Sequence, residues 1–139
     1  MATITEFFDP LELKNQLLRE RAQHAKVERS RQFVAHENEN ELAYLSFDNR
    51  SDIDTGVLYE IFVLPQYRNH GLGTALVSFA EGIARTIGSV RMRVSPRAFD
   101  ASVNQDWLET WYLKQGYSIA NDGSSEFEKS LDSAKAQTP

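Results

Sequence analysis

Residues 57–88 read VLYEIFVLPQYRNHGLGTALVSFAEGIARTIG, and this stretch decides the fold of the chain. Its first part, Val57 to Leu64, is the most apolar run of the sequence and predicts a strand in the interior of a sheet, ended by Pro65. From Gly71 to Ile87, apolar residues recur at the spacing of an amphipathic helix, and Gly88 follows as its C-terminal cap. The sequence therefore predicts a buried strand, a short turn and a long helix in direct succession.

The turn between this strand and this helix, Arg68-Asn69-His70-Gly71-Leu72-Gly73, is typical of a phosphate-binding site. The first amides of a helix have no partner within the helix, and the helix dipole makes that end positive. Glycine at positions 71 and 73 removes side chains that would keep phosphate oxygens from the backbone. Arg68 is placed to add a positive charge, and His70 can add a donor.

Two known phosphate-binding loops are excluded by single residues. The P-loop requires a lysine after its second glycine, where this chain has Thr74. The dinucleotide fingerprint requires a third glycine, where this chain has Leu76. A tight turn without a ligand is the alternative that the glycine spacing alone leaves open.

The elements on either side complete a mixed α/β fold. The preceding part predicts helical sequence from Asp9, with a capping box to Glu12, as far as about Ser30 and with a break. We expect a hairpin of strands 32–36 and 41–47, followed by a polar loop at 48–56. After the long helix we expect a strand at 90–94, a second helix at 104–115, and a last hairpin of strands 117–120 and 125–130. This order predicts a mixed sheet with helices on both faces. Strands 57–64 and 90–94 are expected to be parallel and joined by a right-handed crossover.

Composition narrows the class of protein. The 139 residues suit one domain, expected over residues 1–132, with 133–139 as a disordered tail. No cysteine is present, and the three histidines form no ligand pattern, so no metal is expected. The net charge of -5 and the lack of a basic face argue against nucleic acid as a partner. The sequence has no secretory signal and no apolar span, so we expect a cytoplasmic protein that does not associate with membranes.

The segment from Leu58 to Leu76 resembles the GCN5-related N-acetyltransferase (GNAT) family. It carries that family's Arg/Gln-x-x-Gly-x-Gly/Ala motif after an apolar strand and a proline. Trp111-Tyr112-Leu113-Lys114-Gln115-Gly116-Tyr117 is similar to the family's Tyr-x-x-x-Gly-Phe segment, so the resemblance covers about half the chain. It implies a GNAT-like fold with a central mixed, mostly antiparallel, twisted sheet. In that fold, strand 57–64 splays from strand 90–94 and opens a V-shaped cleft.

The resemblance also implies acetyl-CoA as co-substrate and assigns residues to it. The backbone of Ile61, Phe62 and Val63 would bind the pantetheine arm. The pyrophosphate would be held by Arg68, Asn69, His70, Gly71, Leu72, Gly73 and Thr74. Asn69 stands where the family usually has glycine. The family's asparagine before the tyrosine is Gln105 here, and Asn104 is one place out of register, so either of the two is expected to contact the cofactor.

The resemblance makes Tyr112 the general acid and the Val63 amide the oxyanion donor. Attack of a neutral amine on a thioester needs a deprotonated amine, a stabilised oxyanion and a protonated leaving thiolate. The spacing alone favours Tyr112 as a core aromatic residue beside Trp111 and Trp107, whereas the Tyr-x-x-x-Gly-Tyr context favours the acid.

Glu60 is the only charged residue of the apolar run, and a buried carboxylate needs a partner or a purpose. One interpretation makes it a general base, direct or through water, for the substrate ammonium. The other makes it the ion-pair partner of Arg91 or Arg93 on the neighbouring strand. An unpaired Arg93 would instead bind an acidic group of the substrate.

The expected function is an N-acetyltransferase that moves the acetyl group of acetyl-CoA to a primary amine by direct attack in a ternary complex. The acidic loop from Asp48 to Asp54 favours a small cationic amine, and a peptide amine would suit the same cleft. The alternative is a non-catalytic acyl-CoA-binding or protein-interaction module of the same fold. A third class, an acetylating toxin acting on charged tRNA, lacks the basic surface that RNA binding needs. The resemblance also makes a homodimer possible.

Overall fold

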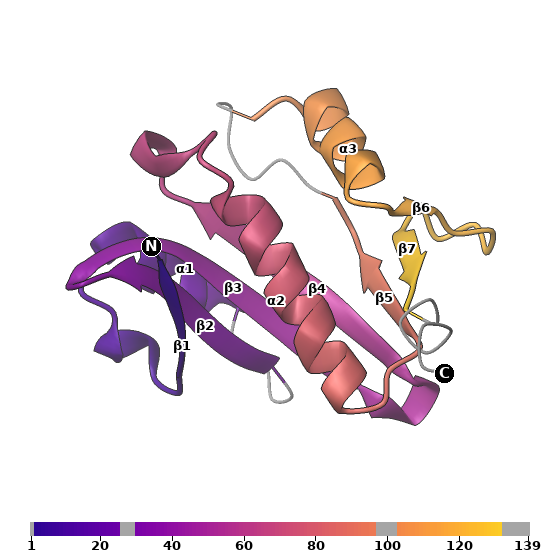
Figure 1. Cartoon of the computed structure of the whole chain (residues 1–139), viewed down its shortest axis with the longest axis horizontal. Coiled ribbons are helices and arrows are strands. Elements are labelled where there is room, and N and C mark those ends of the chain that lie inside the picture. Colours follow the sequence, from indigo (N-terminus) through magenta and orange to yellow (C-terminus); the bar gives the residue numbers. More distant parts are fainter. Residues whose placement is uncertain (1, 26–29, 97–102, 132–139) are drawn as a thin grey trace, which may run out of the picture. The chain divides into compact units, whose positions relative to one another are not determined.

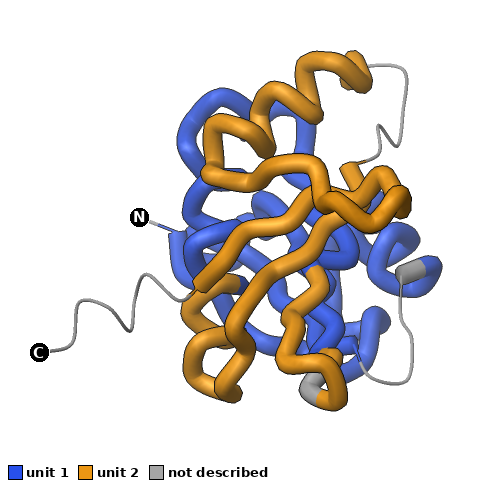
Figure 2. Tube along the Cα trace, turned by 90° about the vertical axis from the view of Figure 1, so that its right-hand side faces the viewer, with its two compact units in different colours: residues 1–49, 58–80 blue, residues 50–57, 81–139 orange. Residues whose placement is uncertain are grey.

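The computed structural model describes residues 2–25, 30–96 and 103–131, and its elements follow one another as Figure 1 labels them. The chain forms two compact units, coloured separately in Figure 2. Unit 1 comprises residues 1–49 and 58–80, and unit 2 comprises residues 50–57 and 81–139. No helix within the described ranges is both long enough and apolar enough to cross a membrane.

In unit 1, β1 (Thr3–Phe7), β2 (Ser30–Glu37) and β3 (Asn40–Arg50) pair antiparallel in sequence order, and the unit also contains residues 58–63 of β4 (Thr55–Val63). The predicted hairpin is confirmed, and it is longer than predicted because β3 continues to Arg50. The polar loop that follows is correspondingly shorter and contains the 3-10 turn η2 (Ser51–Ile53). β1 is not among the predicted elements, since its pairing with β2 depends on residues about 30 positions away.

The predicted helical region between β1 and β2 has the expected break. Its first part is a 3-10 turn, η1 (Pro10–Glu12), with the predicted capping box. The helix α1 (Gln16–Ala25) follows, and the Glu41 carboxylate of β3 accepts the backbone amides of Lys14 and Asn15 in the break. The predicted helical end at Ser30 is wrong because Ser30 begins β2, and residues 26–29 lie outside the described part.

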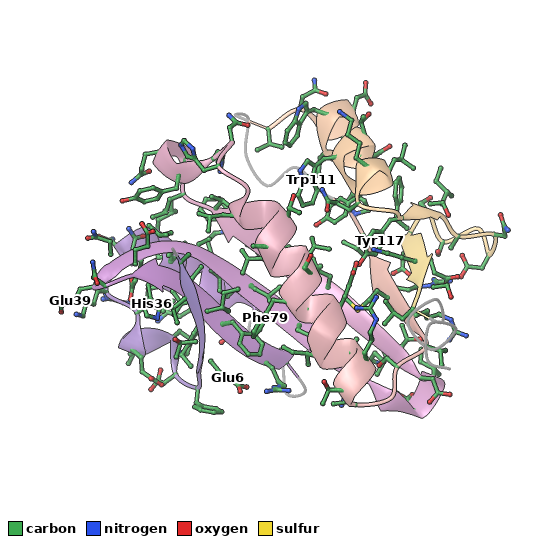
Figure 3. All side chains as sticks on the ribbon, in the orientation of Figure 1. Glu6, His36, Glu39, Phe79, Trp111 and Tyr117 are labelled. Carbon is green, nitrogen blue, oxygen red and sulfur yellow. The ribbon has the colours of Figure 1, made fainter. Side chains whose placement is uncertain are left out.

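Helices cover both faces of the sheet in unit 1. One face packs against α1 in a core cluster of Phe7, Leu13, Leu18, Ala22, Val34, Tyr44, Phe62 and Leu64. On the opposite face, the Phe33 ring of β2 lies 5.0 Å from the ring of Phe79, a residue of α2 (Leu72–Thr86) that Figure 3 labels. Adjacent residues of a strand point to opposite faces, so Phe33 contacts α2 on one face and Val34 belongs to the core cluster on the other.

Unit 2 contains β5 (Arg91–Val94), α3 (Gln105–Lys114), β6 (Ser118–Ile119) and β7 (Phe127–Ser130). β7 pairs antiparallel with both β5 and β6. The Val90 amide donates to the Asp54 carbonyl, which joins the start of β5 to the start of β4 (Thr55–Val63). The strand order is β1-β2-β3-β4-β5-β7-β6, so the predicted mixed, mostly antiparallel fold class is confirmed, with β4 and β5 as neighbours. The predicted tail at 133–139 lies outside the described residues.

Candidate active site

The turn predicted to bind phosphate leads into α2 as expected. A 3-10 turn, η3 (Pro65–Tyr67), follows β4, and α2 begins at Leu72. The Ala75 amide donates to the Gly71 carbonyl at 3.0 Å, which makes Gly71 the N-cap of the helix. The amides from Gly71 to Thr74 therefore belong to the first turn, where an α-helix offers no backbone acceptor of its own.

The backbone of this turn explains two of its residues. Asn69 has φ 67° and Gly71 has φ 84°, both in the left-handed region. Asparagine adopts this conformation more readily than most residues, so it can replace the family's usual glycine. A Cβ built on Gly71 would meet no atom of the described residues within 4 Å. Glycine therefore suits position 71, because the backbone is left-handed there and the absence of a side chain leaves the start of the helix open.

Arg68 folds back toward the strand that precedes it. Its Nε donates to the Val63 carbonyl at 2.8 Å, and its guanidinium lies 5.4 Å from the centroid of the Phe62 ring. These contacts fix η3 to the end of β4 and keep the positive charge beside the turn. The cofactor contacts assigned to Ile61, Phe62 and Val63 stay predictions, as does the oxyanion role of the Val63 amide.

Glu60 is buried at 6% exposure and forms an ion pair that the sequence did not predict. Its Oε2 lies 2.8 Å from Nε of Arg21, a residue of α1. Burial raises the pKa of the Glu60 carboxyl, and the Arg21 and His24 charges oppose that rise. The raised pKa makes the ionised carboxylate a stronger base, and the general-base role of Glu60 stays a prediction.

The predicted partners of Glu60 are engaged elsewhere in unit 2. Arg91 donates to the Ile53 carbonyl at 3.0 Å and to the Thr55 hydroxyl at 3.1 Å. Arg93 contacts three carboxylates, those of Asp122, Glu126 and Glu128, at 2.6, 2.6 and 3.0 Å. The predicted ion pair of Glu60 with Arg91 or Arg93 is therefore wrong. So is the hypothesis of an unpaired Arg93 that binds an acidic substrate.

Tyr112 is buried in unit 2 among aromatic rings. Its ring centroid lies 4.9 Å from that of Trp111 and 5.9 Å from that of Tyr117, both in edge-on arrangements. Figure 3 labels these two neighbours, Trp111 and Tyr117. Burial raises the pKa of the Tyr112 phenol, which keeps it protonated across the neutral range. The packing is that of a core aromatic residue, and the protonated phenol is also what a proton donor requires. The acid role stays a prediction.

Asn104 and Gln105 both serve the start of α3. The Asn104 Oδ1 accepts the Trp107 amide at 3.0 Å and caps the helix. Gln105 Nε2 donates to the Pro96 carbonyl at 3.0 Å and to the Glu109 carboxylate at 2.9 Å. The cofactor contact expected of Asn104 or Gln105 stays a prediction. The hydrogen bonds at the start of α3 give each residue a structural role as well.

A second buried carboxylate, that of Glu81 in α2, was not among the predicted site residues. Its Oε2 accepts the Tyr117 hydroxyl at 2.8 Å, and Lys129 Nζ lies 3.2 and 3.1 Å from its two oxygens. Glu81 lies four residues after Val77 and three before Ala84, so it is a charged residue on the apolar stripe of the helix, just as Glu60 is a charged residue in an apolar strand. A Cβ on Gly116, with φ 98°, would lie 3.2 Å from Lys129 Cε, which accounts for the glycine in the Tyr-x-x-x-Gly-Tyr segment.

A strand that ends in a glycine turn at the start of a helix, within a mixed sheet, is the arrangement that the resemblance to acetyltransferases implied. Residues 28–119 match the family model described as the acetyltransferase (GNAT) domain, about two thirds of the chain. The chain belongs to the GNAT acetyltransferase family, which confirms the resemblance seen in its motifs. A comparison with curated proteins found no match.

Solved structures of the same fold are numerous. The ribosomal-protein-S18-alanine N-acetyltransferase from Escherichia coli superposes with a TM-score of 0.68 at 19% identity, over 94% of each chain. A GNAT acetyltransferase from Elizabethkingia anophelis with acetyl-CoA bound has a TM-score of 0.65 at 14% identity, over 94% of this chain and 98% of that one. Nourseothricin acetyltransferase has a TM-score of 0.57 at 19% identity, over 73% of this chain, which spans only 65% of it. At these identities the likeness shows the fold, which is GNAT-like as predicted.

Proposed function

We propose that this protein is an N-acetyltransferase that transfers the acetyl group of acetyl-CoA to a primary amine by direct attack in a ternary complex. The observation that carries the proposal is the start of α2, where Gly71 is the N-cap and the approach to its Cα is open. The amides from Gly71 to Thr74 would bind the pyrophosphate, because the first turn of a helix directs its amides outward and the helix dipole favours an anion there. The backbone of Ile61 to Val63 would align the pantetheine arm.

Two buried side chains supply the proton transfers in this proposal. Glu60 takes a proton from the substrate ammonium, and its raised pKa suits it to a base that works near neutral pH. Tyr112 donates a hydrogen bond or a proton to the departing thiolate of coenzyme A. Because burial raises the pKa of Tyr112, complete proton transfer costs more than from an ordinary tyrosine, and a hydrogen bond is the larger part of its contribution.

A small cationic amine is the acceptor that we favour. The net charge of -5 and the acidic residues between Asp48 and Asp54 attract cations to the protein. A peptide amine is the second candidate, because the structurally similar Escherichia coli enzyme is named for an alanine of a ribosomal protein. A cytoplasmic location fits the absence of cysteine, and a homodimer fits the exposed Ile119 on the edge strand β6.

The test measures cofactor binding and turnover separately. Saturating acetyl-CoA should raise the melting temperature by several degrees, since a ligand at 100 times its Kd adds about 2.7 kcal/mol. Gly73→Asp should abolish the shift by placing a carboxylate against the pyrophosphate. Gly82→Asp is the matched control, because it adds the same charge to the same helix at a position where a Cβ meets no described atom within 4 Å. Retained affinity in Gly73→Asp would refute the phosphate turn.

Thiol release from acetyl-CoA, screened against small amines and peptide N-termini, then identifies the acceptor. Acetylated product with at least one amine class supports the enzyme. Tight cofactor binding without any product would favour the alternative, a non-catalytic acyl-CoA-binding module.

A further inference from the structure

Polar side chains gather around Glu60 beneath α1 in unit 1. Arg21 and His24 of α1 interact electrostatically with the carboxylate, as does Tyr44 of β3. Gln32 of β2 donates to the Tyr44 hydroxyl at 3.3 Å and adds a neutral polar group to this cluster. Arg21 is the only one of these groups that the structure places in hydrogen-bond contact with Glu60, at 2.8 Å between Nε and Oε2.

Arg21 is held by two contacts on the same face of β4. Glu60 and Phe62 are two residues apart, so their side chains point the same way from the strand. The Arg21 guanidinium bonds the carboxylate and lies 4.9 Å from the centroid of the Phe62 ring. A planar guanidinium is suited to such a site because it can donate along its edge and stack over a ring at the same time.

The two oxygens of Glu60 are used differently. Oε2 accepts from Arg21, while the structure gives Oε1 no hydrogen bond from any residue in the ranges 2–25, 30–96 and 103–131. We propose that Arg21 is a positioning residue for Glu60, which holds Oε2, keeps the carboxylate ionised and leaves Oε1 to accept the proton of the acceptor ammonium. This proposal rests on the proposed function. In the step, one N–H bond of the ammonium breaks, its proton goes to Oε1, and its electron pair stays on the nitrogen as the nucleophile.

The electrostatic reason lies in the burial of Glu60. Removal from water raises the pKa of this carboxyl, and the Arg21 charge is the main opposing influence, ahead of His24. Without Arg21 the buried carboxyl would hold its proton to higher pH and could not act as a base there. The rate of an enzyme with this base falls as the pH drops through the pKa of Glu60. Arg21 therefore extends activity toward lower pH.

The experiment compares the pH dependence of kcat/KM in three variants. Arg21→Met, which keeps an apolar chain against Phe62, should move the acid limb upward by about 1 to 3 pH units. Arg21→Lys keeps the charge and should restore most of the wild-type profile. Arg19→Met is the matched control on the same helix, because the Arg19 guanidinium donates to the Leu13 carbonyl at 3.0 and 2.8 Å. It should leave the acid limb in place.

A double variant separates positioning from general loss of structure. If Arg21 acts through Glu60, Arg21→Met should cause no further loss of kcat in a Glu60→Gln background. An equal loss in both backgrounds, or an acid limb that Arg21→Met does not move, would overturn the proposal. Should Arg21→Met fail to fold, Arg21→Gln removes the charge while keeping a polar donor and serves the same comparison.

A titration that needs no turnover distinguishes failure of this proposal from failure of the proposed function. The 13C signal of the Glu60 carboxyl, followed by NMR, should show a higher midpoint in Arg21→Met than in the wild type and an unchanged midpoint in Arg19→Met. An unmoved midpoint in Arg21→Met refutes the role of Arg21, whatever the enzyme acetylates. A moved midpoint in a protein that acetylates no amine refutes the proposed function, and with it the catalytic purpose of the arrangement.

Discussion

Glu60 and Glu81 are both buried carboxylates, at 6% and 5% exposure, yet their surroundings differ in kind. Among the residues that the structure describes, Glu60 has one hydrogen-bond donor, Arg21, on one oxygen. Glu81 receives the Tyr117 hydroxyl and the Lys129 ammonium, and Lys129 contacts both of its oxygens. Lys129 also donates to the Gln115 carbonyl at the end of α3, so this second cluster ties a helix end to a strand.

This difference indicates which of the two buried carboxylates can accept a proton from a substrate. A carboxylate held on both oxygens by a hydroxyl and an ammonium is fixed by its neighbours, and its removal should mainly loosen the packing around it. A carboxylate with one oxygen held by a cation is oriented and ionised, and its other oxygen can still accept a proton. On the proposed function, we therefore propose a catalytic role for Glu60 and a stabilising role for Glu81.

The largest expected effect is that of Glu60→Gln on turnover. Loss of a general base should lower kcat/KM by about 100- to 10,000-fold. Stability should respond differently, because the raised pKa means that the folded protein binds a proton at Glu60 more tightly than the unfolded chain does. The contribution of Glu60 to stability is then fully present below the unfolded pKa near 4.5 and is lost as the pH rises through the folded pKa.

Steady-state kinetics and urea unfolding at pH 4 and pH 7 check both parts of this prediction. Glu60→Gln should reduce the dependence of the unfolding free energy on pH over this range. A variant with wild-type kcat/KM would remove Glu60 from the mechanism and erase its distinction from Glu81.

The second largest effect concerns Tyr112, the aromatic residue proposed as the general acid. Tyr112→Phe removes only a hydroxyl and should lower kcat by roughly 100-fold, while the affinity for acetyl-CoA changes little. The raised pKa of Tyr112 predicts no alkaline limb from this phenol between pH 7 and 10. Single-turnover rates with thermal-shift titration of the cofactor separate the two quantities, and an unchanged rate would leave Tyr112 as a core residue.

The strand–turn–helix from Val57 to Ile87 was predictable because its signals are local. An apolar run, a proline, two glycines and a helical stripe all lie within a few residues of the groups that they position. Asn69 and Gly71 could likewise be assigned, since positive φ is a property of single residues in a turn. The phosphate site of the proposal depends on these residues alone.

The partner of Glu60 was not predictable in the same way. Arg21 lies 39 positions earlier, on a helix whose packing against β4 no local pattern encodes. The arginines of the neighbouring strand were the nearest candidates for an ion pair with Glu60 by topology. However, Arg93 pairs with three carboxylates, and Arg91 donates to a backbone carbonyl and a hydroxyl. β1 was missed for a related reason, because a five-residue strand acquires its identity from pairing with β2. Glu81, by contrast, could have been found as a charge on an apolar helix stripe.

The third prediction tests the stabilising side of the comparison. Glu81→Gln removes the anion that pairs with Lys129 and should lower the free energy of unfolding by roughly 2 kcal/mol. The effect stays below that of a fully buried pair because the Lys129 side chain is 28% exposed and can reach water. Urea unfolding measures the loss, and kcat at a temperature where the variant is folded should stay within about twofold of the wild type. A large fall in kcat with unchanged stability would reverse the assignment of the two carboxylates.

The smallest effect separates the two neighbouring tyrosines. Tyr117→Phe loses the hydrogen bond from its hydroxyl to Glu81 and should cost about 1 kcal/mol of stability, since Lys129 still satisfies both oxygens of that carboxylate. The ring remains, so the edge-on contact with Tyr112 should persist and kcat should not change. If Tyr117→Phe lowered kcat as much as Tyr112→Phe does, the Glu81 cluster would be positioning the acid, and its role would no longer be stability alone. In the variant that combines Tyr117→Phe with Glu81→Gln, the loss of stability should be smaller than the sum of the two single losses, because both substitutions change the same hydrogen bond.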